Sequence, residues 1–115
     1  MGAIVHIADA RDIAERRLDG ARAADGTPLL WQVARVAAAA PPDARAVAWL
    51  LPVVERGAAT EHELLVAGLT NDELRALRLL ARPFHVELIA RASGYSGWLA
   101  RAVLAAGERD AVVFN

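Results

Sequence analysis

Signals that start and stop helices recur along most of this chain. Thr60 with Glu63 and Thr70 with Glu73 both form the Thr-x-x-Glu pattern of a capping box, in which two side chains satisfy free amides at a helix start. The proline pair at 41–42 ends a helix, because proline lacks the amide that a helix interior needs. Between such signals apolar residues recur three and four positions apart, and no pair of strands is indicated. The sequence therefore predicts an all-α fold, a compact bundle of about six helices.

The segment 43–56 is apolar around most of its circumference. This pattern is typical of a central helix that is buried on several sides. We expect Asp43 to cap this helix at its start. Further upstream, Thr27 is expected as the N-cap of another helix, with Pro28 at the first helical position.

The two ends of the chain have weaker patterns. A first helix is expected over 10–18, followed by a loop rich in small residues. Near the other end, 93–97 is predicted to form a turn before a last helix that carries Trp98. The apolar tail 111–114 is expected to pack on the body of the protein or on a partner.

The composition limits the kind of protein this can be. The length of 115 residues predicts one domain over 1–115, and a hydrophobic content of 56% argues against disorder. The net charge of -1 gives no support for nucleic acid as a partner. No window reaches about 18 uninterrupted apolar residues and no signal peptide is evident, so we expect a cytoplasmic protein without a membrane span. Cysteine and lysine are both absent, which excludes thiolate chemistry, disulfides and lysine catalysis.

Several short stretches resemble the HD-domain phosphohydrolases, of the small type related to the guanosine tetraphosphate hydrolases. The loop 20–28 looks like the glycine–proline loop of that family, and 48–55 looks like the helix whose His-Asp pair gives the family its name. The stretches 60–80 and 99–110 resemble the helices that complete the core of the family. The resemblance thus extends over nearly the whole chain and implies an HD-domain-like fold.

The same resemblance places non-ligands at the metal-binding positions. The two separate histidines of the family correspond to Leu18 and Gln32, the His-Asp pair to Leu51 and Pro52, and the distal aspartate to Gly107. A catalytic divalent metal needs imidazole and carboxylate ligands that lower the pKa of a bound water. The resemblance therefore implies a protein without cofactor or metal, in which we expect phosphohydrolase activity to be absent.

Two residues of the helix 43–56 are of special interest. Pro52 lies inside it, and two interpretations stay open: a tolerated kink, or a kink that shapes a pocket and frees the Ala48 carbonyl. Glu55 is on the same helical face as Leu51 and Pro52. It is therefore the tentative catalytic residue, a general acid or base whose pKa an apolar pocket would raise, although a solvated carboxylate near a helix end is the alternative.

Other polar side chains offer fewer possibilities. Gln32 is a candidate for hydrogen bonding to a ligand, although such a residue is more often a satisfied polar group in the wall of a site. Arg22 corresponds to a loop region that contacts substrate phosphate in the family, although an arginine in a loop is more often solvated. His6, His62 and His85 do not have the spacing of a metal-binding pair. The three tryptophans are expected in the core or in a pocket wall. The residues expected to line a ligand site are Leu18, Arg22, Gln32, Leu51, Pro52 and Gly107.

Several functions remain open on this basis. The first is a pseudoenzyme, a metal-free HD-like protein that binds a small hydrophobic molecule or a protein partner. The second is a metal-free enzyme that uses Glu55 for isomerisation, cyclisation or hydrolysis of a hydrophobic substrate. Residual nucleotide hydrolysis with a metal held by other residues is a third. A homodimer through Trp98 and the tail 112–114 is compatible with the first.

Overall fold

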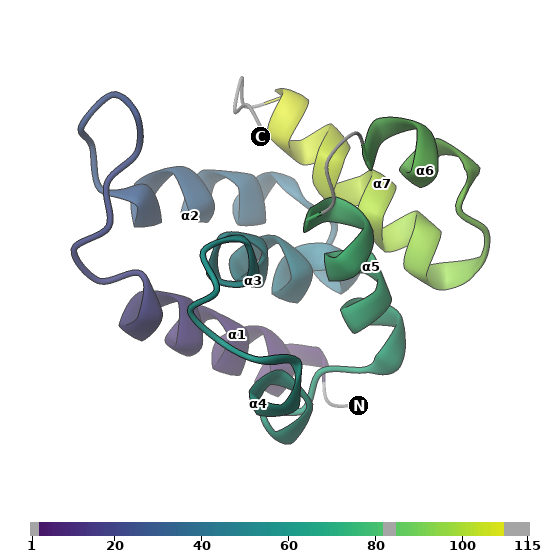
Figure 1. The fold of residues 1–115 in the computed structure, drawn as a ribbon, viewed down its shortest axis with the longest axis horizontal. Coiled ribbons are helices and arrows are strands. Elements are labelled where there is room, and N and C mark those ends of the chain that lie inside the picture. The colour runs from purple at the N-terminus through teal and green to yellow at the C-terminus, as the bar shows by residue number, and fades with distance from the viewer. Residues whose placement is uncertain (1–2, 82–84, 110–115) are drawn as a thin grey trace.

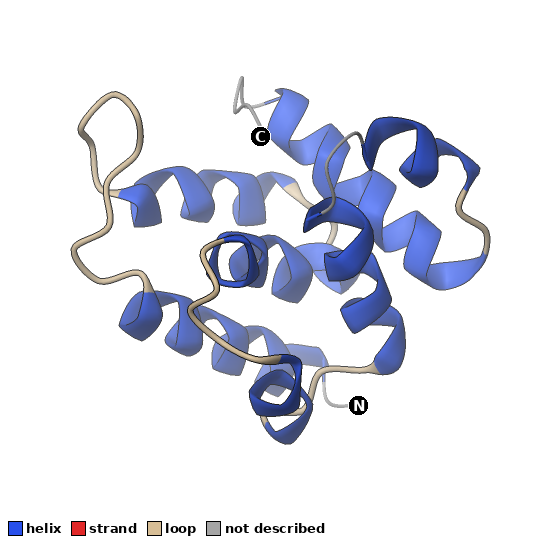
Figure 2. Ribbon diagram, in the orientation of Figure 1, coloured by secondary structure: helices blue, strands red, loops and turns tan. Residues whose placement is uncertain are grey.

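Helices account for nearly all the regular structure of the protein. The computed structural model describes residues 3–81 and 85–109 of the chain, and within these ranges it contains helices and loops without a strand (Figures 1 and 2). This confirms the predicted all-α fold. The elements are α1 Ala3–Arg17, α2 Leu29–Ala39, the short 3₁₀ turn η1 Pro42–Ala44, α3 Arg45–Glu55, α4 Glu61–Val66, α5 Asn71–Ala81, α6 His85–Arg91 and α7 Gly94–Arg109.

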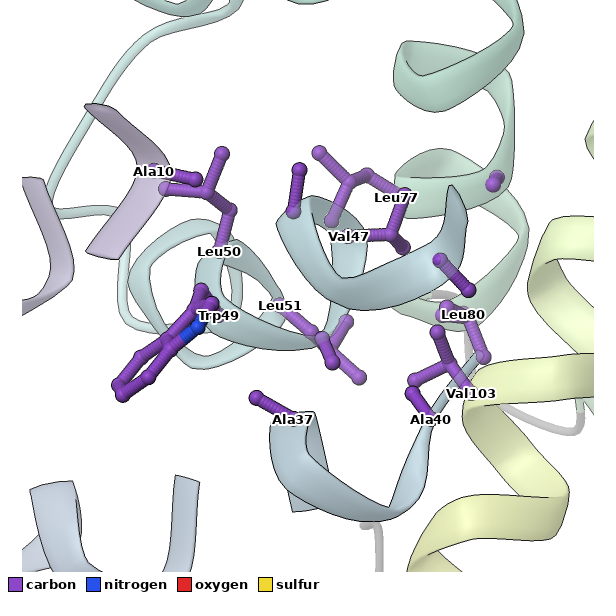
Figure 3. Close-up of a cluster of buried hydrophobic side chains, with 14 of the residues drawn as sticks. Ala10, Ala37, Ala40, Val47, Trp49, Leu50, Leu51, Leu77, Leu80 and Val103 are labelled. Atoms are coloured by element: carbon purple, nitrogen blue, oxygen red, sulfur yellow. The ribbon is translucent and has the colours of Figure 1, made fainter. Parts of the chain in front are cut away.

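Helix α3 lies at the centre of the bundle, as its apolar sequence predicted. It contacts α1, α2, α5 and α7, and Figure 1 shows it between α1 and α2. In Figure 3, Leu50 points toward Ala10 of α1 and Val47 points toward Leu77 of α5. Burial of such side chains removes apolar surface from water, at about 25 cal/mol per Å², and is the main force that holds the bundle together.

Helix α1 begins earlier than the expected residue 10, at Ala3. The reason is a stripe of apolar residues that continues toward the N-terminus. Ile7 packs against the core in line with the fully buried Ala10 and Ala14, at the spacing of one helix face. This face of α1 packs against the core, where α3 is its neighbour.

Both capping boxes are present as predicted. The Thr60 side chain accepts a hydrogen bond from the Glu63 amide (3.1 Å), and Glu63 in turn accepts from the Thr60 amide (3.1 Å). At the start of α5, the Thr70 amide donates to Glu73 (2.9 Å) and the Glu73 amide donates to the Thr70 hydroxyl (3.2 Å). These two reciprocal pairs fix the starts of α4 and α5.

The two N-caps predicted from single residues are wrong. Pro28, not Thr27, is the N-cap of α2, and the Thr27 hydroxyl instead donates to Asp25 at 2.7 Å. A side chain that is already engaged within the loop does not cap the helix. Asp43 lies inside η1, and Ala44 is the N-cap of α3 without a side-chain bond, because the 3₁₀ turn carries the chain directly into the helix.

The predicted turn at 93–97 is also wrong in part, because α7 already begins at Gly94. The first turn of α7 passes very close to the end of α6. A Cβ atom at Gly97 would lie 2.4 Å from the carbonyl oxygen of Ala92, a distance that no real side chain tolerates. Arg101 joins the same two elements, since its Nη1 donates to the carbonyl of Ala92 at 2.7 Å. Of the two glycines that indicated a turn, Gly97 thus serves close packing of a helix, whereas Gly94 has the positive φ of 74° that is common in turns. The tail 111–114 lies outside the described residues.

Helix α7 has 16 residues and is the longest of the C-terminal half. None of the helices that the structure describes is long and apolar enough to cross a membrane.

Candidate functional site

Of the five positions that the HD-domain resemblance sets against metal ligands, three are buried in this protein and two, Gln32 and Pro52, are half-buried. Leu51 of α3 is 0% exposed and Leu18, directly after α1, is 1% exposed. Both belong to the main cluster of buried apolar side chains, and Figure 3 shows Leu51 in this cluster together with Ala37 of α2. Gly107, in the last turn of α7, is buried as well. Aliphatic side chains of this kind contribute packing and offer no lone pair to a metal.

Gln32 and Arg22 lie at the edge of this region. Gln32 is half-buried in the first turn of α2. Arg22 is exposed in the preceding loop, where its Nη1 donates to the Gly26 carbonyl at 2.9 Å. The amide of Ala23 also donates across this loop, to the carbonyl of Thr27 at 2.8 Å. Arg22 therefore contributes to closing its own loop.

Pro52 is accommodated within α3 without ending it. The helix continues to Glu55, and the Pro52 carbonyl accepts a hydrogen bond from the Arg56 amide at 3.1 Å. The proline has no amide to donate to the Ala48 carbonyl four residues earlier. Its half-buried ring lies beside the fully buried Leu51 and Val53.

Glu55 is the last residue of α3 and has an unusual electrostatic environment. Desolvation raises the pKa of its carboxyl group to about 7, although the residue as a whole is exposed to solvent. Within the described part of the chain, Glu55 makes no hydrogen bond or ion pair that would offset this desolvation. A carboxyl group with this pKa is a competent proton donor and acceptor near neutral pH. The exposure of the residue limits the size of the effect, because water screens charge at the surface.

No alternative metal site is evident among the side chains that the structure describes. These contain no group of three or more His, Cys, Asp or Glu residues that could hold a metal ion. His62 is exposed on α4, and the side chains of His6 and His85 lie outside the described residues.

Two of the three tryptophans are at the surface, which corrects the expectation that all line the core or a pocket. Trp31 is 62% exposed, and Trp98 of α7 is also exposed and stacks on Tyr95 with ring centroids 5.8 Å apart. Only Trp49 is buried as expected, beneath the guanidinium of Arg11. The spacing of Tyr95 and Trp98, three residues apart, places them on one helix face. Sequence reasoning missed this pair because it assigned 93–97 to a turn.

In comparisons with known proteins, no family model, no curated protein and no solved structure matches this chain. The resemblance to HD-domain phosphohydrolases therefore stays a prediction that depends on the motifs quoted above.

Proposed function

We propose that this protein is a metal-free, HD-like helical domain that binds a small ligand or a protein partner and does not hydrolyse phosphate esters. The observation that carries the proposal is the burial of Leu18 and Leu51 in the apolar core. A metal site needs polar ligands around a space that the ion and a water can occupy. At these positions the chain has aliphatic side chains that pack against other aliphatic side chains.

The surface favours a protein partner over an interior ligand. Tyr95 and Trp98 form an exposed stacked pair on α7, and Leu88 of α6 is exposed as well. Aromatic side chains are enriched at the centres of protein interfaces, where they bury a large area. A second copy of the chain is one candidate partner.

The absence of hydrolysis can be tested directly. Purified protein would be incubated with guanosine tetraphosphate and Mn²⁺, and pyrophosphate release would be measured. We expect no release above the protein-free rate. Release that EDTA abolishes and that rises in proportion to protein concentration would contradict the proposal.

Self-association can be tested separately by sedimentation velocity over a range of concentrations. If the exposed aromatic pair mediates a dimer, Trp98→Ala should shift the profile toward monomer. Trp31→Ala is the matched control, because Trp31 is more exposed but lies on α2. A wild-type protein that stays monomeric at all concentrations would exclude the homodimer and leave a different partner.

A second candidate function is a metal-free enzyme that uses Glu55 as general acid or base. The observation that favours it is the desolvation that raises the pKa of Glu55 to about 7. The substrate class would be a hydrophobic small molecule undergoing isomerisation, cyclisation or hydrolysis. Glu55→Gln should abolish turnover of any such substrate while the fold persists, and an unchanged rate would remove Glu55 from the mechanism.

A further inference from the structure

Helix α4 is attached to the rest of the protein differently from the other helices. It has six residues and is only sparsely packed against the other helices. Leu64 is buried, whereas Leu65 and Val66 are exposed, the latter at 74%. A helix this short is not stable by itself in water, so its contacts with the body must maintain it.

Two ion pairs link α4 to its neighbours, one to α1 and one to α5. On the α1 side, Arg17 Nη2 lies 2.6 Å from Glu63 Oε2, and Arg17 Nη1 donates to the Ala58 carbonyl at 2.9 Å. On the α5 side, Nε and Nη2 of Arg78 donate to the two carboxylate oxygens of Glu61, with Nε 2.7 Å from Oε2. Paired hydrogen bonds of this kind fix the relative orientation of the two groups as well as their distance.

Glycines in the left-handed region flank the helix on both sides. Gly57 has φ of 66° and Gly68 has φ of 109°. Glycine adopts these and many other backbone conformations at little cost, so both positions can change conformation without a side-chain clash. Few backbone hydrogen bonds cross these boundaries, among them those from the Ala58 amide to Val53 at the end of α3 and from the Leu69 amide to Leu64.

We propose that residues 57–68, here called the flap, open as a unit from a helical core that stays folded, and that the Arg17–Glu63 and Arg78–Glu61 ion pairs hold the flap closed. Opening withdraws Leu64 from the core cluster and uncovers the apolar surface against which it packs. The flap thus controls access to apolar surface beside α1 and α5. This inference does not depend on the function proposed above.

Hydrogen exchange of the full-length protein tests the flap. The amides of Ala58 and Leu69 report on it, because their hydrogen bonds to the carbonyls of Val53 and Leu64 cross the two ends of the flap. Amides inside α3 and α7 report on the core. In an Arg17→Gln/Arg78→Gln double variant we expect flap amides to exchange about three- to tenfold faster, as is typical for the loss of two exposed pairs, with core amides unchanged.

Two controls distinguish the flap from a general loss of stability. Arg16→Gln removes an ion pair of the same type within α1, to Asp12, and should leave exchange of the flap unchanged. Raising NaCl from 0.05 to 1 M should accelerate flap exchange in the wild type and have little effect in the double variant, because salt screens exposed charges. Equal protection of flap and core in the wild type, or unchanged flap exchange in the double variant, would overturn the proposal.

Discussion

At the scale of single residues, the identity of the buried side chains decides whether a metal could be bound in the core. Leu18 and Leu51, which the resemblance to HD domains sets against metal-binding histidines, are both fully buried in the apolar core. Their identity could be read from the sequence, but their packing could not, because it depends on residues distant along the chain. Glu55 illustrates the same limit, since its position on the helix was predictable and its exposure was not.

Glu55 should make the stability of the protein dependent on pH. Its pKa in the fold is about 7, against an ordinary value of 4.5. Between these values the folded protein binds more protons than the unfolded chain, so stability is fully present below about pH 4.5 and falls as pH rises toward 7. We expect a loss of about 1 kcal/mol, a value reduced for solvent screening because the residue is exposed.

Urea unfolding at pH 4 to 8 measures this effect. Glu55→Gln should match the wild type at low pH and exceed its stability at pH 8. Glu108→Gln, which changes an exposed glutamate in the last turn of α7, is the control and should leave the pH dependence intact. Parallel pH profiles for wild type and Glu55→Gln would contradict the account of Glu55.

Gly97 should be intolerant of any side chain. A Cβ atom would meet the Ala92 carbonyl oxygen at 2.4 Å, and this oxygen belongs to backbone, which cannot move aside as the end of a flexible side chain could. We expect Gly97→Ala to destabilise the protein by about 2 kcal/mol through overpacking, whereas Ser96→Ala at the neighbouring position should be nearly neutral. Thermal unfolding distinguishes the two, and an unchanged midpoint for Gly97→Ala would show that α6 and α7 are not in this close contact.

At the scale of elements, the sequence was most informative where a structure depends on neighbouring residues. The two capping boxes join residues three positions apart and were predicted correctly. The N-caps expected at Thr27 and Asp43 failed because a loop hydrogen bond and a 3₁₀ turn compete for the same residues. The start of α7 was missed because glycines serve turns and close packing alike.

The capping box of α5 offers a test at this scale. Thr70→Ala removes the hydroxyl that accepts from the Glu73 amide, and we expect a loss of about 1 kcal/mol in the free energy of unfolding. Thr70→Ser retains the hydroxyl and should recover most of this loss. If serine and alanine variants unfold at the same urea concentration, the hydroxyl does not cap the helix.

At the scale of the whole molecule, the described residues form a bundle around α3 whose interior is aliphatic and whose surface carries an exposed aromatic pair. The central position of α3 could be predicted from its apolar sequence. The exposure of Trp31 and Trp98 could not, because apolar content alone does not tell which face a neighbouring helix covers. The aliphatic interior and the exposed aromatic pair are the two observations behind the proposed recognition of a partner.

The proposed function requires that the protein carries no metal at the positions that the HD-domain resemblance assigns to ligands. A native mass spectrum of the protein as purified, compared with its denatured mass, tests this most directly. We expect the mass of the bare chain, or of a multiple of it if copies associate. An added mass of one or two divalent ions that a chelator removes would contradict the claim.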